Sequence, residues 1–195
     1  MDDQASEVLL VGLPTHDGRA VISSLVELTG LGRLLGGPIR ILTGEGGNIP
    51  RARNYVMEQA RRESTSKYEW ILWMDSDIVL SPGGNVHIAA AIEWSKRTGK
   101  GWVAHYRMAD GRSCLMRERQ LMDPHHYTLQ ELGALPEWSE IGMAGMGLAF
   151  LRMDLSYVFR ADVVGEDINF FLDHPDMTIH YAKRINLGHR KTVVL

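Results

Sequence analysis

Two aspartates separated by a single residue follow an apolar segment near the middle of the chain. Residues 69–74 are expected to form a buried strand, and Asp75-Ser76-Asp77 comes directly after them. Ligands of open α/β sheets bind beyond the carboxyl ends of the strands. Side chains two positions apart in an extended chain point the same way, so Asp75 and Asp77 can face one divalent cation. The alternative is that both aspartates cap the turn before Ser81-Pro82.

A second acidic pair, Glu166-Asp167, follows Gly165 and precedes the apolar residues Ile168, Phe170 and Phe171. The pattern predicts a short helix over 167–172 with both carboxylates at its start. A carboxylate placed there can accept a proton from a hydroxyl nucleophile within hydrogen-bond reach. The alternative is a structural role, because acidic side chains at a helix start satisfy free amides and complement the helix dipole.

Histidines supply the third group of candidates. His189 follows Gly188 and a predicted strand over 185–187, and is either a metal ligand or a surface side chain. The pair His125-His126 is assigned to a loop, as ordinary loop residues or as acceptor contacts.

The elements around these residues alternate between strands and helices, which indicates βαβ units. We expect an α/β fold with a mainly parallel central sheet, helices on both faces and a small antiparallel addition. Strands are predicted over 7–13, 38–43, 69–74, 147–151, 178–181 and 185–187, helices over 19–28, 48–62 and 81–96, and a hairpin of 102–107 with 113–116 around Asp110-Gly111. Asn48 is expected to cap the second helix, Ser81-Pro82 to start the third, and Gly30, Gly32, Gly36 and Gly37 to supply a turn. Residues 117–140 show no clean period and are predicted to be irregular.

Composition narrows the classes of function. The 195 residues, of which 45% are hydrophobic and 23% charged, fit a single globular domain over 1–195. The net charge of −3 gives no broad basic surface for nucleic acid, although Arg51, Arg53, Arg61 and Arg62 could form a local patch. Cys114 is the only cysteine, which excludes an intrachain disulfide and a cysteine-based zinc site. No apolar run approaches the roughly 20 residues of a membrane span, and the acidic start is unlike a secretory signal, so we expect a cytoplasmic protein.

Several segments, in order, resemble the metal-dependent GT-A fold glycosyltransferases, in particular their small bacterial and phage-type members. The matching segments are Val11-Gly12-Leu13-Pro14-Thr15, Arg51-Ala52-Arg53-Asn54, Asp75-Ser76-Asp77, Gly145-Met146-Gly147 to Leu151, Val164-Gly165-Glu166-Asp167 and Gly188-His189. Each motif is weak alone, but together they span nearly the whole chain. The resemblance divides the domain into a nucleotide-sugar-binding half over 1–107 and an acceptor-side, catalytic half over 108–195.

The resemblance implies a role for each matched residue. Nucleotide-sugar contacts fall on Pro14, Thr15, Glu45, Arg53, Asn54, Asp75 and Ser76, metal ligation on Asp75, Asp77 and His189, the acceptor side on Gly145, Met146 and Gly147, and catalysis on Asp167 and Glu166. Glu45 is a substitute here, because many relatives have an aspartate against the base where this chain has Gly44-Glu45-Gly46-Gly47. The implied cofactor is Mn²⁺ or Mg²⁺, the donor a UDP- or GDP-sugar, and the acceptor a hydroxyl, with nucleic acid still among the acceptors.

Two other functions compete for the same residues. Asp75-Ser76-Asp77-Ile78-Val79 also resembles the motif of haloacid dehalogenase-like phosphatases, in which Asp75 would be the nucleophile. Those enzymes normally carry the motif on their first strand, whereas two βα units precede it here. A nucleotide-sugar-binding module without catalysis is the other alternative. The phosphate-binding glycine motifs of Rossmann dehydrogenases and P-loop enzymes are absent from the sequence.

Overall fold

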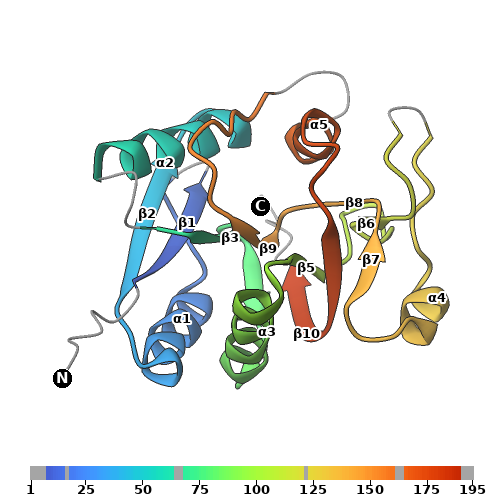
Figure 1. Cartoon of the computed structure of the whole chain (residues 1–195), viewed down its shortest axis with the longest axis horizontal. Helices are drawn as coiled ribbons and strands as arrows, with labels where there is room; N and C mark the ends of the chain where they lie inside the picture. The colour runs from blue at the N-terminus through green and yellow to red at the C-terminus, as the bar shows by residue number, and fades with distance from the viewer. Residues whose placement is uncertain (1–7, 16–17, 64–67, 121–122, 161–164, 190–195) are drawn as a thin grey trace, which may run out of the picture.

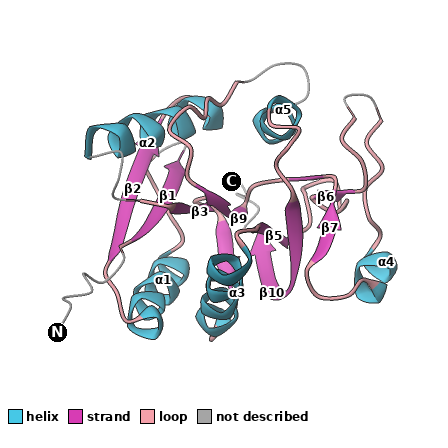
Figure 2. Ribbon diagram, viewed as in Figure 1, coloured by secondary structure: helices cyan, strands magenta, loops and turns pink. Residues whose placement is uncertain are grey.

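The computed structural model describes residues 8–15, 18–63, 68–120, 123–160 and 165–189, with the backbone alone for Ile22 and His189. Its elements, drawn in Figures 1 and 2, are β1 (Leu9–Thr15), α1 (Ile22–Leu35), β2 (Ile39–Glu45), α2 (Ile49–Glu63), β3 (Trp70–Met74), β4 (Ile78–Leu80), α3 (Gly84–Thr98), β5 (Gly101–His105), β6 (Leu115–Met116), α4 (Leu129–Ala134), β7 (Ser139–Ile141), β8 (Met143–Ala144), β9 (Leu148–Arg152), α5 (Glu166–Asp173) and β10 (Ile179–His189). No helix in these ranges is long and apolar enough to cross a membrane.

The central sheet has the order β2-β1-β3-β9-β5-β10-β4, and β7 pairs with β10. The pairings make β2, β1, β3, β5 and β10 run in one direction and β9, β4 and β7 in the other. A small antiparallel sheet of β6 and β8 adjoins it. The expected α/β fold with a mostly parallel sheet is therefore confirmed. Strand β9, from the predicted catalytic half, lies between β3 and β5 of the predicted nucleotide half, so the two halves share one sheet.

The helices cover the sheet as right-handed crossovers require. The chain moves from β1 outward to β2 through α1 and returns to β3 through α2, which places the two helices on opposite faces. Figure 1 shows α1 and α3 side by side below the sheet and α2 above it. Both faces of the inner strands are thereby covered, and all of β3 is buried.

Helix α1 is longer than predicted, because Gly30 and Gly32 lie inside it and not in the following turn. Leu28 and Leu31 continue its buried face at 0% exposure, and this packing outweighs the roughly 1 kcal/mol that each helical glycine costs. A Cβ on Gly30 would lie 2.5 Å from the Asn85 amide nitrogen, so this glycine also permits close packing on α3. The helix ends at Gly36, whose φ of 67° is left-handed.

The capping predictions had mixed outcomes. Asn48 accepts a hydrogen bond from the Arg51 amide at 3.0 Å and caps α2, as predicted. Ser81-Pro82 does not start α3. The Ser81 carbonyl accepts from the Gly84 amide in a turn, and the helix begins only after Gly83, whose φ is 75°. The preceding residues form β4, which the sequence analysis missed because its three residues are too few to show a period.

The second half differs from its prediction in three places. The supposedly irregular 117–140 contains α4, started by a capping box between Thr128 and Glu131, and the beginning of β7. The expected hairpin is reduced to a bridge between Arg107 and Ser113, because β6 pairs with β8. The two predicted strands over 178–181 and 185–187 form one strand, β10, with an irregular register between Tyr181 and Asn186.

Candidate active site

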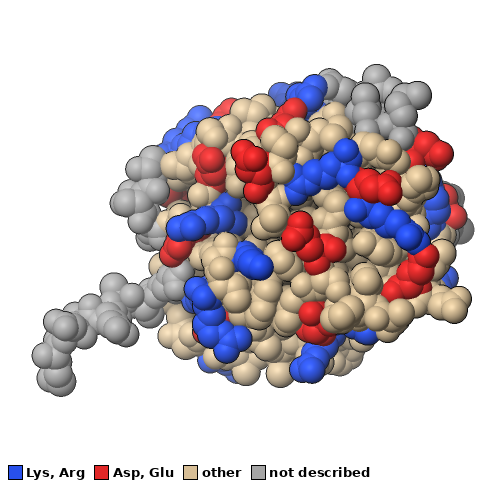
Figure 3. Space-filling view, turned by 45° about the vertical axis from the view of Figure 1, so that its right-hand side comes forward, with Lys and Arg blue, Asp and Glu red and all other residues tan. Residues whose placement is uncertain are grey.

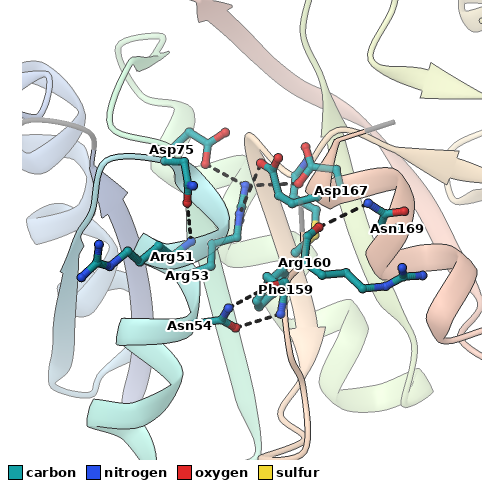
Figure 4. A network of polar contacts seen from close by, with 11 residues as sticks. Arg51, Arg53, Asn54, Asp75, Phe159, Arg160, Asp167 and Asn169 are labelled. Atoms are coloured by element: carbon teal, nitrogen blue, oxygen red, sulfur yellow. Dashed lines mark hydrogen bonds and ion pairs between the residues drawn. The ribbon is translucent and has the colours of Figure 1, made fainter. Parts of the chain in front are cut away.

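Asp75 of the first acidic pair meets Glu166 and Asp167 of the second beyond the carboxyl end of β3. Asp75 follows β3 directly, and its amide donates to the Gly147 carbonyl at 2.8 Å. Glu166 and Asp167 form the first turn of α5 after Gly165, which has a left-handed φ of 86°. Side chains of Asp75, Glu166 and Asp167 are each 20% exposed. Carboxylates about 90 positions apart in the sequence thus lie close together at one partly buried site, shown in Figure 4.

Arg53 joins these carboxylates from α2. Its Nη2 lies 2.9 Å from Asp75 Oδ1 and 3.3 Å from Asp167 Oδ1, and its Nε lies 4.0 Å from Glu166 Oε1. The guanidinium is fully buried, with its carbon 5.4 Å from the Trp73 ring centroid and 5.6 Å from that of Phe159. Figure 4 shows it between Asp75 and Asp167. At 0% exposure Arg53 lies behind the carboxylates and serves as their counterion, and its contact with a nucleotide stays a prediction.

The single positive charge of Arg53 only partly balances the carboxylates of Asp75, Glu166 and Asp167. Burial alone lowers the pKa of Arg53, but the charges of Asp75, Asp167 and Glu166 outweigh it and raise that pKa. Burial raises the pKa of Asp75 to about 7, with Arg53 opposing and Asp167, Asp77 and Glu166 adding to the shift. Burial likewise raises the pKa of Asp167 to about 6, against Arg53 and the Met146 amide. Several carboxylates that share one buried arginine favour the arrival of further positive charge.

The segment Gly145-Met146-Gly147 contacts both acidic pairs through its backbone. The Met146 amide donates to Asp167 Oδ2 at 3.0 Å, while the Gly147 carbonyl accepts from Asp75. The acceptor-side role of these residues stays a prediction.

Tyr106 is the residue of this region that the sequence analysis missed. It follows β5 and is 8% exposed. Burial raises its pKa well above the ordinary value, and Cys114, Asp167 and Asp75 add to the shift, so the phenol stays protonated. A Cβ on Gly145 would lie 2.2 Å from the Tyr106 hydroxyl, and one on Gly147 would lie 2.6 Å from a ring carbon. The glycine spacing was a signal for a large neighbour, but the sequence did not tell which one.

The predicted nucleotide loop lies at the carboxyl ends of β1 and β2. Pro14 and Thr15 end β1 and are buried, and the Thr15 hydroxyl donates to the Gly44 carbonyl at 3.4 Å and accepts from the Gly18 amide at 3.0 Å. Glu45 is exposed and pairs in register with Thr15. Their nucleotide contacts remain predictions.

Two other predicted nucleotide contacts have structural partners. The Asn54 amide donates to the Phe159 carbonyl at 2.6 Å and accepts from the Phe159 amide at 2.8 Å, which ties α2 to the segment after β9. The Ser76 carbonyl accepts from the Val21 amide ahead of α1. The role of both residues toward a nucleotide stays a prediction.

The metal ligands Asp75, Asp77 and His189 stay predictions. No group of three His, Cys, Asp or Glu side chains close enough to hold a metal occurs among the described residues, which do not include the His189 side chain. The predicted role of His189 therefore lies outside the described residues. Its backbone pairs with that of Ile78, the residue after Asp77, so β10 brings it to the end of the Asp75-Ser76-Asp77 turn.

The other predicted contacts lie elsewhere or are already engaged. His125 pairs with Glu118 at 2.9 Å, and His126 contacts the Ser113 carbonyl and Arg112, around a cavity of about 730 Å³.

The proposed basic patch does not form, because Arg53 is buried and Arg61 donates to the carbonyls of Leu155 and Tyr157. On the face shown in Figure 3, basic and acidic side chains are interspersed.

No protein-family model matches the sequence, and no curated protein matches it. Solved structures that resemble the fold include a glycosyltransferase involved in the glycosylation of the major capsid of PBCV-1, at 14% identity and a TM-score of 0.39, covering 75% of this chain. This chain spans 61% of that protein. A nucleoside-diphosphate-sugar pyrophosphorylase from Vibrio cholerae RC9 matches at 12% identity and a TM-score of 0.38, over 91% of this chain and 72% of the other. Both are similarities of fold, so a function for this chain has to come from its own side chains.

Proposed function

We propose that the protein is a glycosyltransferase that moves a sugar from a nucleoside-diphosphate sugar to a hydroxyl acceptor with the help of Mn²⁺ or Mg²⁺. The observation that carries the proposal is the meeting of Asp75 with Glu166 and Asp167 around the buried Arg53. Sugar transfer from a diphosphate needs positive charge at the leaving group and a base at the attacking hydroxyl. One group of carboxylates can hold the cation at the leaving group, and the other can supply the base at the attacking hydroxyl.

The first group, Asp75 and Asp77, suits a hard cation. Carboxylate oxygens are the ligands that Mg²⁺ and Mn²⁺ prefer, and magnesium is usually held by one or two carboxylates together with substrate phosphates. Without such an ion, an anionic diphosphate would be repelled by carboxylates that have Arg53 as their shared counterion. When bound, the cation would neutralise the departing diphosphate, and His189 is the proposed third ligand from this chain.

The second group provides the base. Asp167 Oδ1 is buried against Arg53. Oδ2 accepts a hydrogen bond from the Met146 amide and keeps a second lone pair that can accept another. We assign Oδ2 as the atom that accepts the proton of the acceptor hydroxyl in an inverting transfer. Glu166 then orients the acceptor or the start of α5. If the transfer retains configuration, Asp167 positions the acceptor instead.

The test separates donor binding from chemistry. Calorimetry with UDP and GDP should show binding that Mn²⁺ strengthens and that Asp77→Asn abolishes. Asp110→Asn is the matched control, because Asp110 is an exposed turn residue paired with Arg112 and asparagine also suits that turn. Equal nucleotide affinity in Mn²⁺ and in chelator would contradict the proposal.

The phosphatase alternative is checked with the same proteins. A glycosyltransferase should release nucleoside diphosphate from UDP- or GDP-sugars and leave p-nitrophenyl phosphate intact. Hydrolysis of p-nitrophenyl phosphate that disappears in Asp75→Asn would assign Asp75 as a nucleophile and replace the proposal.

A further inference from the structure

The backbone segment 145–147 is hydrogen-bonded to both acidic groups. Its Gly147 carbonyl accepts from the Asp75 amide at 2.8 Å, and its Met146 amide donates to Asp167 Oδ2 at 3.0 Å. A displacement of this segment would therefore change the position of the proposed base relative to the proposed metal site. The contacts that hold segment 145–147 in place therefore affect both the proposed base and the proposed metal site.

The aromatic ring of Tyr106 packs directly against this segment. A Cβ on Gly145 would lie 2.2 Å from the tyrosine hydroxyl, and a Cβ on Gly147 would lie 2.6 Å from ring carbon Cε1 and 2.9 Å from Ile78 Cδ1. Real Cβ atoms do not approach other atoms this closely, so the backbone and the ring touch with no room for a side chain.

Cys114 links Tyr106 to the same segment. The Tyr106 amide donates to Cys114 Sγ at 3.3 Å, the Cys114 amide donates to the Tyr106 carbonyl at 3.1 Å, and the Gly145 amide donates to the Cys114 carbonyl at 2.8 Å. Cys114 is fully buried. Tyr106 and the segment are thus attached to the same residue, which fixes the ring relative to the backbone that it supports.

We propose that Tyr106 is a positioning residue that sets the separation of the two acidic groups by holding the segment 145–147 against them. Its ring and hydroxyl fill the space that is left because Gly145 and Gly147 have no side chains. The function of this device rests on the proposed glycosyl transfer, but the position of the Met146 amide is measurable without any substrate.

The structure predicts different outcomes for the two glycines. Adding a methyl group at Gly145 collides first with the hydroxyl, so removing that oxygen by Tyr106→Phe should relieve much of the strain. A methyl group at Gly147 collides with the ring itself and with Ile78, which Tyr106→Phe leaves in place. Gly147→Ala is therefore the matched control for Gly145→Ala.

The readout is the Met146 amide signal in the protein labelled with ¹⁵N-methionine, assigned with Met146→Leu. In the wild type it should titrate with the Asp167 carboxyl, whose charged surroundings are Arg53 on α2, Asp75 after β3 and Glu166 on α5, with the polar Tyr106 hydroxyl after β5. Gly145→Ala should shift this signal and weaken its titration. In Gly145→Ala/Tyr106→Phe the wild-type behaviour should largely return, judged against Tyr106→Phe alone, whereas Gly147→Ala/Tyr106→Phe should stay perturbed.

Kinetics supply the second arm. A misplacement near 1 Å can cost about 10²-fold in rate, so Gly145→Ala should lower kcat by about that factor with little change in donor KM, and Tyr106→Phe should restore most of it. Tyr106→Leu, which keeps both glycines, should perturb the Met146 signal and covers the case that Gly145→Ala does not fold. Wild-type Met146 titration in Gly145→Ala or Tyr106→Leu, or equal rescue of both glycine variants, would overturn the proposal. If the wild type shows no sugar transfer but the variants change the Met146 amide signal as predicted, the proposed function fails and the positioning role of Tyr106 stands.

Discussion

The two ends of α5 each carry an aspartate paired with an arginine, and the two pairs behave in opposite ways. At the start, Asp167 lies 3.3 Å from the buried Arg53, and burial raises its pKa to about 6. At the end, Asp173 accepts two hydrogen bonds from Arg160, at 2.7 and 2.8 Å, and these lower its pKa. Residue type and helix are the same, so the surroundings decide the sign. A buried aspartate that is costly to ionise is a candidate for function, whereas an exposed one with a good partner is ordinary surface chemistry.

The largest expected difference between the two ends is catalytic. Asp167→Asn removes the proposed base and should lower sugar transfer by about 10²- to 10⁴-fold, while metal-dependent nucleotide binding stays nearly intact. Asp173→Asn makes the same chemical change on the same helix and should leave transfer close to wild type. Release of nucleoside diphosphate in the presence of acceptor measures both. Equal activities in the two variants would remove Asp167 from the chemical step.

The next difference concerns stability. Arg53→Met leaves the carboxylates without their buried counterion and should lower the free energy of unfolding by about 3–5 kcal/mol at neutral pH. Arg160→Met breaks an exposed pair and should cost about 1 kcal/mol or less. Urea unfolding of both variants gives the comparison directly. Similar losses would show that Arg53 is stabilised by its packing on Trp73 and Phe159 and not by charge.

The third expected difference is a pH dependence of opposite sign at the two ends. Asp75 and Asp167 hold protons in the folded state up to about pH 7 and 6, above the unfolded value of 3.8. Their contribution to stability is complete below pH 3.8 and is lost as the pH rises through these folded values. The lowered pKa of Asp173 acts the other way, giving stability above pH 3.8 that is lost as the pH falls through the folded value.

This pH effect is measured by urea unfolding between pH 4.5 and 7.5 without added metal. The stability of the wild type relative to Asp75→Asn should decrease as the pH rises, because asparagine does not ionise. A difference that stays constant over this range would contradict the raised pKa of Asp75.

The sequence predicted elements whose signals are local. The strand over residues 69–74 and the Asn48 cap of α2 followed from short patterns, and their positions were nearly right. The end of α1 was wrong, because the packing of Leu28 and Leu31 overrode two glycines. The five strand residues over 101–105 and the irregular register of β10 depend on neighbours that are distant in sequence, so local patterns gave only approximate limits.

The acidic residues of the site were found from motifs, but their arrangement was not. Arg53 was assigned to the nucleotide by the resemblance of Arg51-Ala52-Arg53-Asn54, and only the fold shows three carboxylates and two aromatic rings around it. Tyr106 was missed because it has no motif of its own. Its importance depends on contacts with glycines about 40 positions later in the chain.

The insertion of β9 between β3 and β5 has a consequence for how the chain reaches its folded state. During synthesis β3 and β5 are both made well before residues 148–152, so β3 can pair with β1 but lacks its other neighbour, and β5 has no neighbour, until most of the chain has emerged. Such late, long-range strand pairing is slow and leaves strand edges exposed in the meantime. The central sheet is therefore expected to close late and cooperatively, and the residues of the proposed donor side depend for their final order on a strand that is made with the proposed acceptor side.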